Sequence, residues 1–201
     1  MFPSRLTTAL ALALLLGACA QSASTDKPQF PHAAITPAPV AVPALSLENT
    51  AGKLTSLDQF KGKWVWLYMG YTSCPDVCPA AMSYLAHEYK LLKNPILVQG
   101  VFVSVDPKRD TPKKLGEWAH FYDAHFVGLT GDKTTIAAIA KPLGFGYSFD
   151  PPDKTGFYGV EHTNLVFVLD PQGRYVATYV PGDQPGMMAQ DFNALTKEKA
   201  S

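Results

Sequence analysis

Two cysteines that are four positions apart stand between a strand pattern and a helix pattern, and this segment constrains the fold most. It reads GYTSCPDVCP over residues 70–79, with thiols at Cys74 and Cys78. The apolar run before it, residues 64–69, is typical of a buried strand, and residues 80–92 carry apolar side chains at helical spacing. The sequence therefore predicts a strand, a turn that holds both thiols, and a helix.

The spacing of Cys74 and Cys78 allows two kinds of chemistry. Side chains four residues apart on a helix face have Cβ atoms about 5–6 Å apart, which suits a soft metal ion held by both sulfurs. The same separation is within reach of a disulfide bond. A helix N-terminus favours the thiolate, so we expect a lowered cysteine pKa. Spacing alone does not choose between a metal site and a redox disulfide of Cys74 and Cys78.

His162 is the strongest candidate for a third metal ligand. It directly precedes the strand pattern of residues 163–169, and in a thioredoxin-like sheet the start of that strand lies beside the cysteine turn. Soft thiolates select Cu(I), and imidazole also suits Cu(II). Structural zinc usually takes four protein ligands, and no obvious fourth is present. The alternative is that His162 is a hydrogen-bonded structural residue.

The other polar and sulfur-bearing residues are predicted to have structural roles. Met69 and Met82 fit the strand and helix patterns and are expected in the core. Asp76 is expected to be a turn residue. The segment Lys108, Arg109 and Asp110 is most simply a solvated loop before a helix, with a docking role as the alternative. No ligand spacing marks the remaining histidines of the domain, which are His87, His120 and His125.

The order of predicted elements is that of a thioredoxin-like α/β fold. Strands are predicted at residues 64–69, 96–105, 125–129, 163–169 and 174–180, and helices at residues 80–92, 112–122, 132–143 and 184–198. Extended pieces at residues 145–149 and 158–160 flank a segment rich in proline and glycine. Buried apolar runs joined by helices favour parallel strands, and the turn at residues 170–173 returns the last strand antiparallel. We expect a central mixed sheet flanked by helices, with an N-terminal hairpin over residues 45–56.

Residues 1–18 have the pattern of a lipoprotein signal peptide. One positive charge, Arg5, precedes an apolar run that is too short for a comfortable membrane span. The segment LGAC at residues 16–19 resembles a bacterial lipobox, in which Cys19 is lipidated and becomes the N-terminal residue. Residues 19–43 are rich in proline and alanine and are expected to be a linker from Cys19 to a domain over residues 44–201. The expected location is the cell envelope, with the protein lipid-anchored to a bacterial membrane and facing the periplasm.

The net charge and the number of cysteines argue against two classes of protein, nucleic-acid-binding proteins and small domains built on a disulfide framework. Lysine and arginine together number 17, as do aspartate and glutamate, so the formal net charge is zero. A nucleic-acid partner is not expected, because binding to phosphates needs a basic surface. Three cysteines are also too few for a disulfide framework in a domain of this size. The pair Cys74 and Cys78 is therefore better interpreted as reactive or metal-binding.

Four segments together resemble the Sco/SenC family, copper-binding thioredoxin-like proteins that serve cytochrome c oxidase assembly. They are GYTSCPDVCP at residues 70–79, SVDPKRDTP at residues 104–112, GLTG at residues 128–131 and EHT at residues 161–163. The resemblance covers about residues 45–195 and implies that Cys74, Cys78 and His162 bind copper. Glu161 stands where the family often has aspartate, and it keeps the charge.

The resemblance implies a membrane-tethered copper metallochaperone that delivers copper to the CuA centre of cytochrome c oxidase. The implied partners are the copper-site subunit of the oxidase and an envelope thiol reductant, because Cu(I) binding needs reduced thiols in an oxidising compartment. Two other functions stay open. One is a thiol-disulfide reductase that acts on cysteines of an envelope or oxidase-subunit partner and keeps its activity without His162. The other is a copper-sensing regulator that binds copper without transfer.

Overall fold

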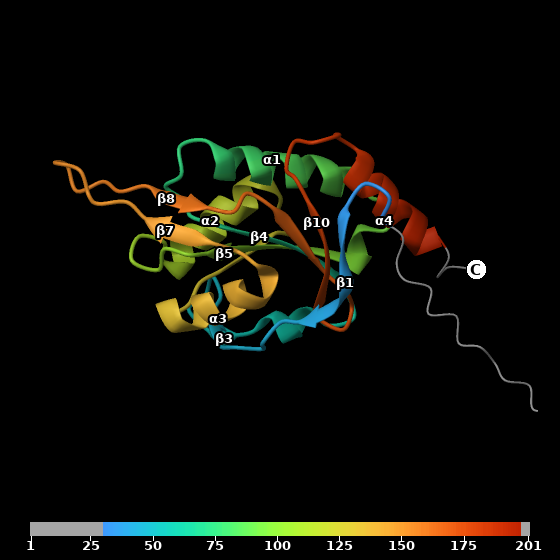
Figure 1. Cartoon of the computed structure of the whole chain (residues 1–201), viewed down its shortest axis with the longest axis horizontal. Coiled ribbons are helices and arrows are strands. Elements are labelled where there is room, and N and C mark those ends of the chain that lie inside the picture. Colours follow the sequence, from blue (N-terminus) through green and yellow to red (C-terminus); the bar gives the residue numbers. More distant parts are fainter. Residues whose placement is uncertain (1–29, 198–201) are drawn as a thin grey trace, which may run out of the picture.

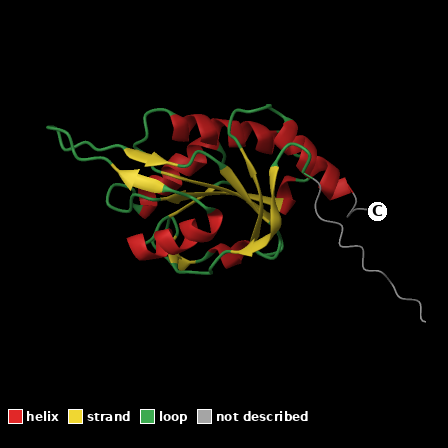
Figure 2. Cartoon of the chain, in the orientation of Figure 1, coloured by secondary structure: helices red, strands yellow, loops and turns green. Residues whose placement is uncertain are grey.

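The computed structural model describes residues 30–197 and shows a mixed β-sheet with helices on both sides (Figure 1; Figure 2). The strands of the central sheet are β1 (Ala34–Ala41), β4 (Trp64–Gly70), β5 (Val98–Ser104), β6 (Val127–Leu129), β9 (Val166–Leu169) and β10 (Arg174–Tyr179). Their order across the sheet is β1-β10-β9-β4-β5-β6. The pairs β4–β5 and β5–β6 are parallel, and the other pairs are antiparallel. The predicted central mixed sheet is confirmed.

Four helices and two small hairpins complete the described chain. The helices are α1 (Val77–Lys90), α2 (Pro112–Tyr122), α3 (Lys133–Leu143) and α4 (Met187–Lys197), with short 3-10 turns η1 (Leu57–Phe60) and η2 (Pro95–Leu97). The hairpins are β2 (Leu47–Glu48) with β3 (Leu54–Thr55), and β7 (Tyr147–Phe149) with β8 (Val160–His162). Within residues 30–197, no helix is both long and apolar enough to cross a membrane.

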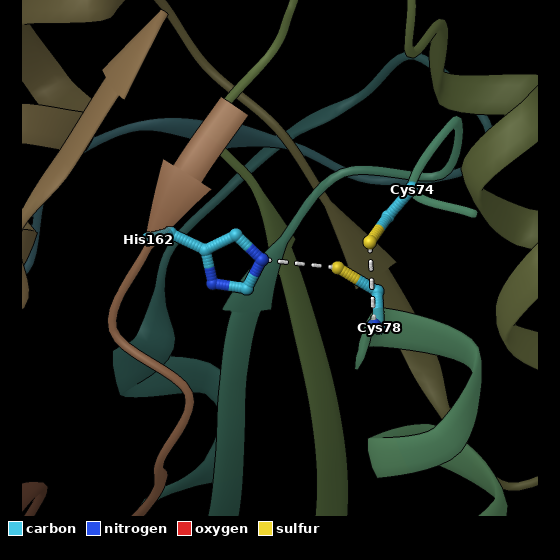
Figure 3. Close-up of side chains that lie close together, drawn as sticks. All are labelled: Cys74, Cys78 and His162. Carbon is cyan, nitrogen blue, oxygen red and sulfur yellow. Dashed lines mark hydrogen bonds between the residues drawn. The ribbon is translucent and has the colours of Figure 1, made fainter. Parts of the chain in front are cut away.

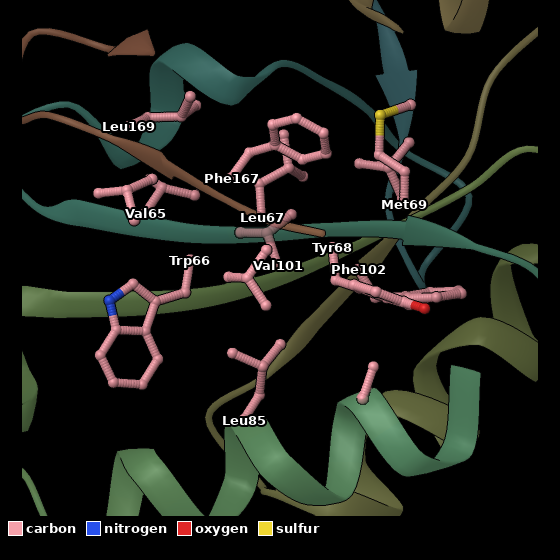
Figure 4. Close-up of a cluster of buried hydrophobic side chains, with 14 of the residues drawn as sticks. Val65, Trp66, Leu67, Tyr68, Met69, Leu85, Val101, Phe102, Phe167 and Leu169 are labelled. Atoms are coloured by element: carbon pink, nitrogen blue, oxygen red, sulfur yellow. The ribbon is translucent and has the colours of Figure 1, made fainter. Parts of the chain in front are cut away.

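β4 is the central strand because it pairs with β5 on one side and β9 on the other. All seven of its residues are buried, which explains why the segment is apolar throughout instead of alternating. Trp66 points toward α1, whereas Val65 and Met69 point to the opposite side of the strand (Figure 4). The Trp66 ring packs edge-on against Phe192 of α4, with ring centroids 5.1 Å apart. The core therefore fills both faces of the strand that leads to the cysteines.

Local sequence signals correctly predicted the ends of α2 and α3. Thr111 caps α2 by accepting a hydrogen bond from the Lys114 N–H, and Pro112 is its first residue. Asp132 caps α3 in the same way through the Thr135 N–H. α3 ends at Leu143 and is followed by Gly144, whose φ of 66° lies in the left-handed region that glycine adopts without strain.

α1 begins earlier than predicted, at Val77 instead of residue 80. Pro79 therefore lies within the first turn of the helix, where backbone N–H groups have no partner inside the helix and a proline costs no hydrogen bond. As a result, Cys78 belongs to the first turn of α1, and only Cys74 lies in the preceding turn. The prediction that the turn holds both thiols is wrong for Cys78.

The prediction of a linker over residues 19–43 is wrong for its last part, and the domain does not start at residue 44. β1 pairs antiparallel with β10 at the edge of the sheet. Its prolines are compatible with this position because an edge strand has one side without ladder hydrogen bonds, and its pairing is irregular between Ile35 and Val40. Phe30 is 1% exposed and packs against Trp64. The predicted signal peptide and Cys19 lie outside the described residues.

The β7–β8 hairpin and its connecting loop project from one end of the molecule, away from α4 (Figure 1). Its two strands form a sheet of their own. The prediction of two extended pieces that flank an excursion is confirmed. The hairpin matters for function because His162 is the last residue of β8.

Candidate metal centre

Cys74, Cys78 and His162 converge at the end of β4 (Figure 3). Cys74 comes from the turn after β4, Cys78 from the first turn of α1, and His162 from the β7–β8 hairpin. Their sulfur and nitrogen atoms all lie within 4.8 Å of one another. The fold thus brings together the three residues that the sequence predicted as metal ligands.

The imidazole of His162 presents a lone pair to the sulfurs. Its Nδ1 lies 3.1 Å from the Thr163 carbonyl oxygen, which can only accept, so Nδ1 carries the proton. Nε2 is then the free acceptor, and it lies 3.2 Å from Cys78 Sγ. Figure 3 shows the ring pointing at this sulfur. A hydrogen bond to a backbone carbonyl is the usual way in which a metal-binding histidine is oriented.

The electrostatics of the site keep the histidine neutral and make the two thiols unequal. Burial lowers the pKa of His162, although the Thr163 carbonyl acts in the opposite direction. Burial raises the pKa of Cys78. Burial also opposes ionisation of Cys74, but backbone N–H groups of Cys78 and Asp76 outweigh it and lower the Cys74 pKa overall. Both thiols are free in the structure, so Cys74 is the thiol that ionises first.

Aromatic rings enclose the histidine on several sides. The rings of Tyr68 and Tyr71 meet the imidazole nearly edge-on, each at 6.1 Å between centroids. Phe145 stacks on it at 6.0 Å. These rings restrict the orientation of His162. Two soft sulfurs and one imidazole in such surroundings suit Cu(I) better than a hard, oxygen-seeking cation.

In the loop between β5 and α2, three charged residues were expected to be solvated, and this expectation is wrong for two of them. Asp110 is 1% exposed, and its carboxylate accepts hydrogen bonds from the Thr72 N–H at 2.8 Å, the Thr72 hydroxyl at 2.5 Å and the Ser104 hydroxyl at 2.7 Å. Arg109 is largely buried against Tyr158. Lys108 alone of the three predicted solvated residues is exposed.

Sequence reasoning missed Asp110 and Arg109 because a charged segment beside prolines looks solvated when its partners are far away in sequence. Thr72 and Asp110 are 38 residues apart. The segment SVDPKRDTP contains both residues and carries part of the family resemblance. That resemblance is the signal in the sequence that points to a role for them beyond a solvated loop.

The remaining candidates lie where they were expected. Met69 and Met82 are buried in the core at 0% and 1% exposure. Asp76 is exposed at the N-terminus of α1, and its side chain makes no capping hydrogen bond. The other histidines of the predicted domain are exposed, and these are His87, His120 and His125. Within residues 30–197, the metal-binding geometry is confined to Cys74, Cys78 and His162.

Comparison with protein families gives a match over most of the chain. The family model described as SCO1/SenC matches residues 34–197 of this chain. This range includes β1, in agreement with the structural start of the domain.

Individual relatives of this chain are SCO or copper-binding proteins by description. A mitochondrial SCO2 homologue of Bos taurus is 34% identical over 137 residues, which are 67% of this chain and 52% of that protein. The chain therefore spans about half the length of this relative. A protein of Stutzerimonas stutzeri described as a putative copper-binding protein is 34% identical over 136 residues, or 66% of each chain.

Solved structures of similar proteins contain copper. Bradyrhizobium japonicum ScoI with copper bound has a TM-score of 0.70 and 31% identity, and the match covers 77% of this chain and 99% of that one. Yeast Sco1 with copper bound has a TM-score of 0.68 and 26% identity, with 81% and 90% covered. The fold predicted from the sequence is thus the fold of these proteins.

Proposed function

The chain belongs to the SCO1/SenC family, and we propose that it binds one copper ion through Cys74, Cys78 and His162 and delivers it to the CuA centre of cytochrome c oxidase. The resemblance of its motifs to the Sco/SenC family implies a role in cytochrome c oxidase assembly, and two similar proteins have been solved with copper bound. The observation that carries the proposal is the convergence of two sulfurs and the unprotonated Nε2 of a neutral imidazole within 4.8 Å. That donor set suits Cu(I) and also accommodates Cu(II).

Delivery uses the unequal exposure of the ligands. Cys78 is buried, whereas Cys74 is partly exposed, so an incoming thiolate reaches the metal from the Cys74 side. As the acceptor thiolate bonds to Cu(I), the Cys74 sulfur leaves and takes up the proton that the acceptor thiol gave up. Copper keeps its oxidation state throughout, so transfer needs no electron donor. Three protein ligands leave a position for this exchange.

A thiol reductant of the envelope is a necessary partner. A disulfide between Cys74 and Cys78 would remove both sulfur ligands, and the envelope favours oxidation of exposed thiols. The reductant therefore acts before copper binds, and it meets the partly exposed Cys74 first.

The proposed location is the cell envelope, with the protein anchored to a bacterial membrane through a lipid on Cys19 and facing the periplasm. Support comes from the short apolar run and the LGAC segment at residues 16–19. Replacing Cys19 with serine removes the only site of lipidation in that segment. We expect the variant to move from the membrane fraction to the soluble fraction, and retention in the membrane would overturn the lipid anchor.

The delivery proposal is tested by transfer. The reduced protein is loaded with Cu(I) under anaerobic conditions, mixed with the apo form of the oxidase copper-site domain, separated from it, and both are analysed for copper. We expect the copper to appear in the acceptor. Copper that stays with the loaded protein would contradict delivery and would favour a copper sensor.

A thiol-disulfide reductase is the second candidate, and the contrast between the two thiols favours it. A partly exposed thiol with a lowered pKa beside a buried one is suited to attack and resolution in exchange reactions. The two functions differ in their need for His162. Reduction of a disulfide in the oxidase copper-site domain by the copper-free protein, at a rate unchanged in His162→Ala, would support the reductase.

A further inference from the structure

The ligands of the proposed copper site come from two parts of the domain, the central sheet with α1 and the β7–β8 hairpin, which are not joined by β-sheet pairing. Cys74 lies in the turn after β4 and Cys78 at the start of α1. His162 belongs to the β7–β8 hairpin, whose two strands pair only with each other among the described strands. The distance from Nε2 to the sulfurs therefore depends on side chains that hold the hairpin against the body of the domain.

Arg109 makes that connection on the hairpin side. Its Nη1 donates a hydrogen bond to the Tyr158 carbonyl oxygen at 2.8 Å. Its guanidinium carbon lies 3.6 Å from the centre of the Tyr158 ring, a close cation–π contact. Its Nε donates to Asp106, and the Tyr158 hydroxyl donates to the same carboxylate at 2.9 Å. Asp106, Arg109 and Tyr158 thus form a closed set of contacts between the β5–α2 loop and the hairpin.

The same guanidinium reaches the cysteine side of the site. It lies 5.3 Å from the centre of the Tyr71 ring, and Tyr71 in turn packs edge-on against His162. Its Nη2 is buried and has no hydrogen-bond partner among residues 30–197. The Asp106 carboxylate and the rings of Tyr71 and Tyr158 therefore stabilise the guanidinium charge, although Nη2 itself has no acceptor. The adjacent Asp110 holds Thr72 of the cysteine turn.

We propose that Arg109 is a positioning residue that holds the β7–β8 hairpin against the cysteine turn and so fixes the distance of His162 Nε2 from the two sulfurs. The proposal rests on copper binding by Cys74, Cys78 and His162. Arg109 contacts none of the three ligands. Its side-chain hydrogen bonds go to Asp106 of its own loop and to Tyr158 of the hairpin, so its loss loosens the imidazole more than the thiolates.

Cu(I) and Cu(II) binding together distinguish loss of the imidazole from loss of the thiolates. Two thiolates alone still bind Cu(I), whereas the imidazole is the ligand that suits Cu(II). We therefore expect Arg109→Ala to keep Cu(I) binding and to weaken Cu(II) binding by about tenfold, the lower end of the effect of removing a group that orients a metal ligand. Its Cu(II) electron paramagnetic resonance spectrum should lose the nitrogen hyperfine structure, as in His162→Ala. Arg109→Lys should be intermediate, because an ammonium cannot span both acceptors as a guanidinium does.

Arg174 provides a matched control. It also pairs with a buried aspartate, Asp170, at 2.6 Å. That pair follows Leu169, which is opposite Val65 near the start of β4, so it lies at the other end of the strand from the cysteines. Arg174→Ala should therefore remove an ion pair of the same type and leave the Cu(II) spectrum unchanged.

Amide hydrogen exchange of the copper-free proteins gives a readout that is independent of the metal. Exchange in residues 147–162 should be faster in Arg109→Ala than in the wild type and in Arg174→Ala. If Arg109→Ala does not fold, Arg109→Lys and Tyr158→Phe, which removes only the hydroxyl bond to Asp106, carry the same comparison.

The outcomes separate this inference from the proposed function. Wild-type spectra, wild-type affinity and unchanged exchange in the Arg109 variants would overturn the positioning role while copper binding stands. A wild-type protein that binds no copper, or a His162→Ala protein that matches the wild type, would overturn the copper site and with it the role of Arg109.

Discussion

At the scale of single residues, the two thiols of the site have different surroundings and therefore different reactivity. Cys78 is fully buried beneath the turn, whereas Cys74 is partly exposed and accepts a backbone hydrogen bond from the Cys78 N–H. The pKa of Cys74 is lowered and that of Cys78 is raised. The site thus has one partly exposed thiol and one that the protein encloses.

Cys74 is expected to react with iodoacetamide well before Cys78 in the reduced, copper-free protein. Because its pKa is lowered, its rate should rise with pH and reach half its maximum below the pH found for an ordinary thiol. Peptide mapping by mass spectrometry after timed labelling measures both rates. Equal labelling of the two cysteines at neutral pH would contradict the asymmetry.

Asp110→Ala is expected to destabilise the fold by about 3 kcal/mol, because it leaves the Thr72 N–H and the Ser104 hydroxyl without their acceptor inside the protein. Urea unfolding monitored by tryptophan fluorescence measures the change. Asp58→Ala is the control, because Asp58 forms an exposed ion pair with Lys61 and its loss should have little effect. A similar free energy of unfolding for both variants would show that Asp110 does not hold the cysteine turn.

At the scale of elements, the sequence predicts what is decided locally and misses what is decided by distant contacts. β4 was recognised from its continuous apolar run, and α2 and α3 from their caps at Thr111 and Asp132. β1 was missed because its prolines are typical of a linker, and only the pairing with β10 and the burial of Phe30 make it part of the domain. The three side chains that converge, Cys74, Cys78 and His162, could be named from their residue types and the family resemblance, whereas the contacts of Arg109 and Asp110 required the fold.

Gly70→Ala is expected to displace the Cys78 sulfur. A Cβ at this last residue of β4 would lie 2.7 Å from Cys78 Sγ and 3.3 Å from the Tyr68 ring. Neither neighbour is free to move in the packed core, so we expect a loss of stability of about 1–3 kcal/mol. Copper affinity should fall with it, which a competitive Cu(I) titration checks. Unchanged copper affinity would show that the sulfur position tolerates the added methyl group.

The N-terminal edge of the sheet gives a test of the domain boundary. Phe30→Ala should lower the free energy of unfolding by about 3 kcal/mol, because its ring packs against Trp64 and Phe192 in the core. Ile35→Ala is the control, because Ile35 lies in the same edge region but is 48% exposed. Chemical denaturation measures both, and equal effects would mean that the domain starts after Phe30.

At the scale of the whole molecule, the fold assembles one site from three separate parts of the chain. The turn after β4 and the start of α1 supply the thiols, and the projecting β7–β8 hairpin supplies the imidazole. The β5–α2 loop contacts the turn through Asp110 and the hairpin through Arg109. The arrangement is not evident from the order of the residues, because Cys78 and His162 are 84 positions apart in the sequence. The arrangement places a soft donor set at one end of the sheet, in which Cys74 is the partly exposed thiol.

X-ray absorption at the copper edge of the Cu(I)-loaded, reduced protein tests this account most directly, because it counts the sulfur and nitrogen ligands. The account predicts two sulfur ligands and one imidazole nitrogen in the wild type, with the nitrogen lost in His162→Ala. A copper ion bound by sulfur alone in the wild type, or a spectrum unchanged by His162→Ala, would contradict it.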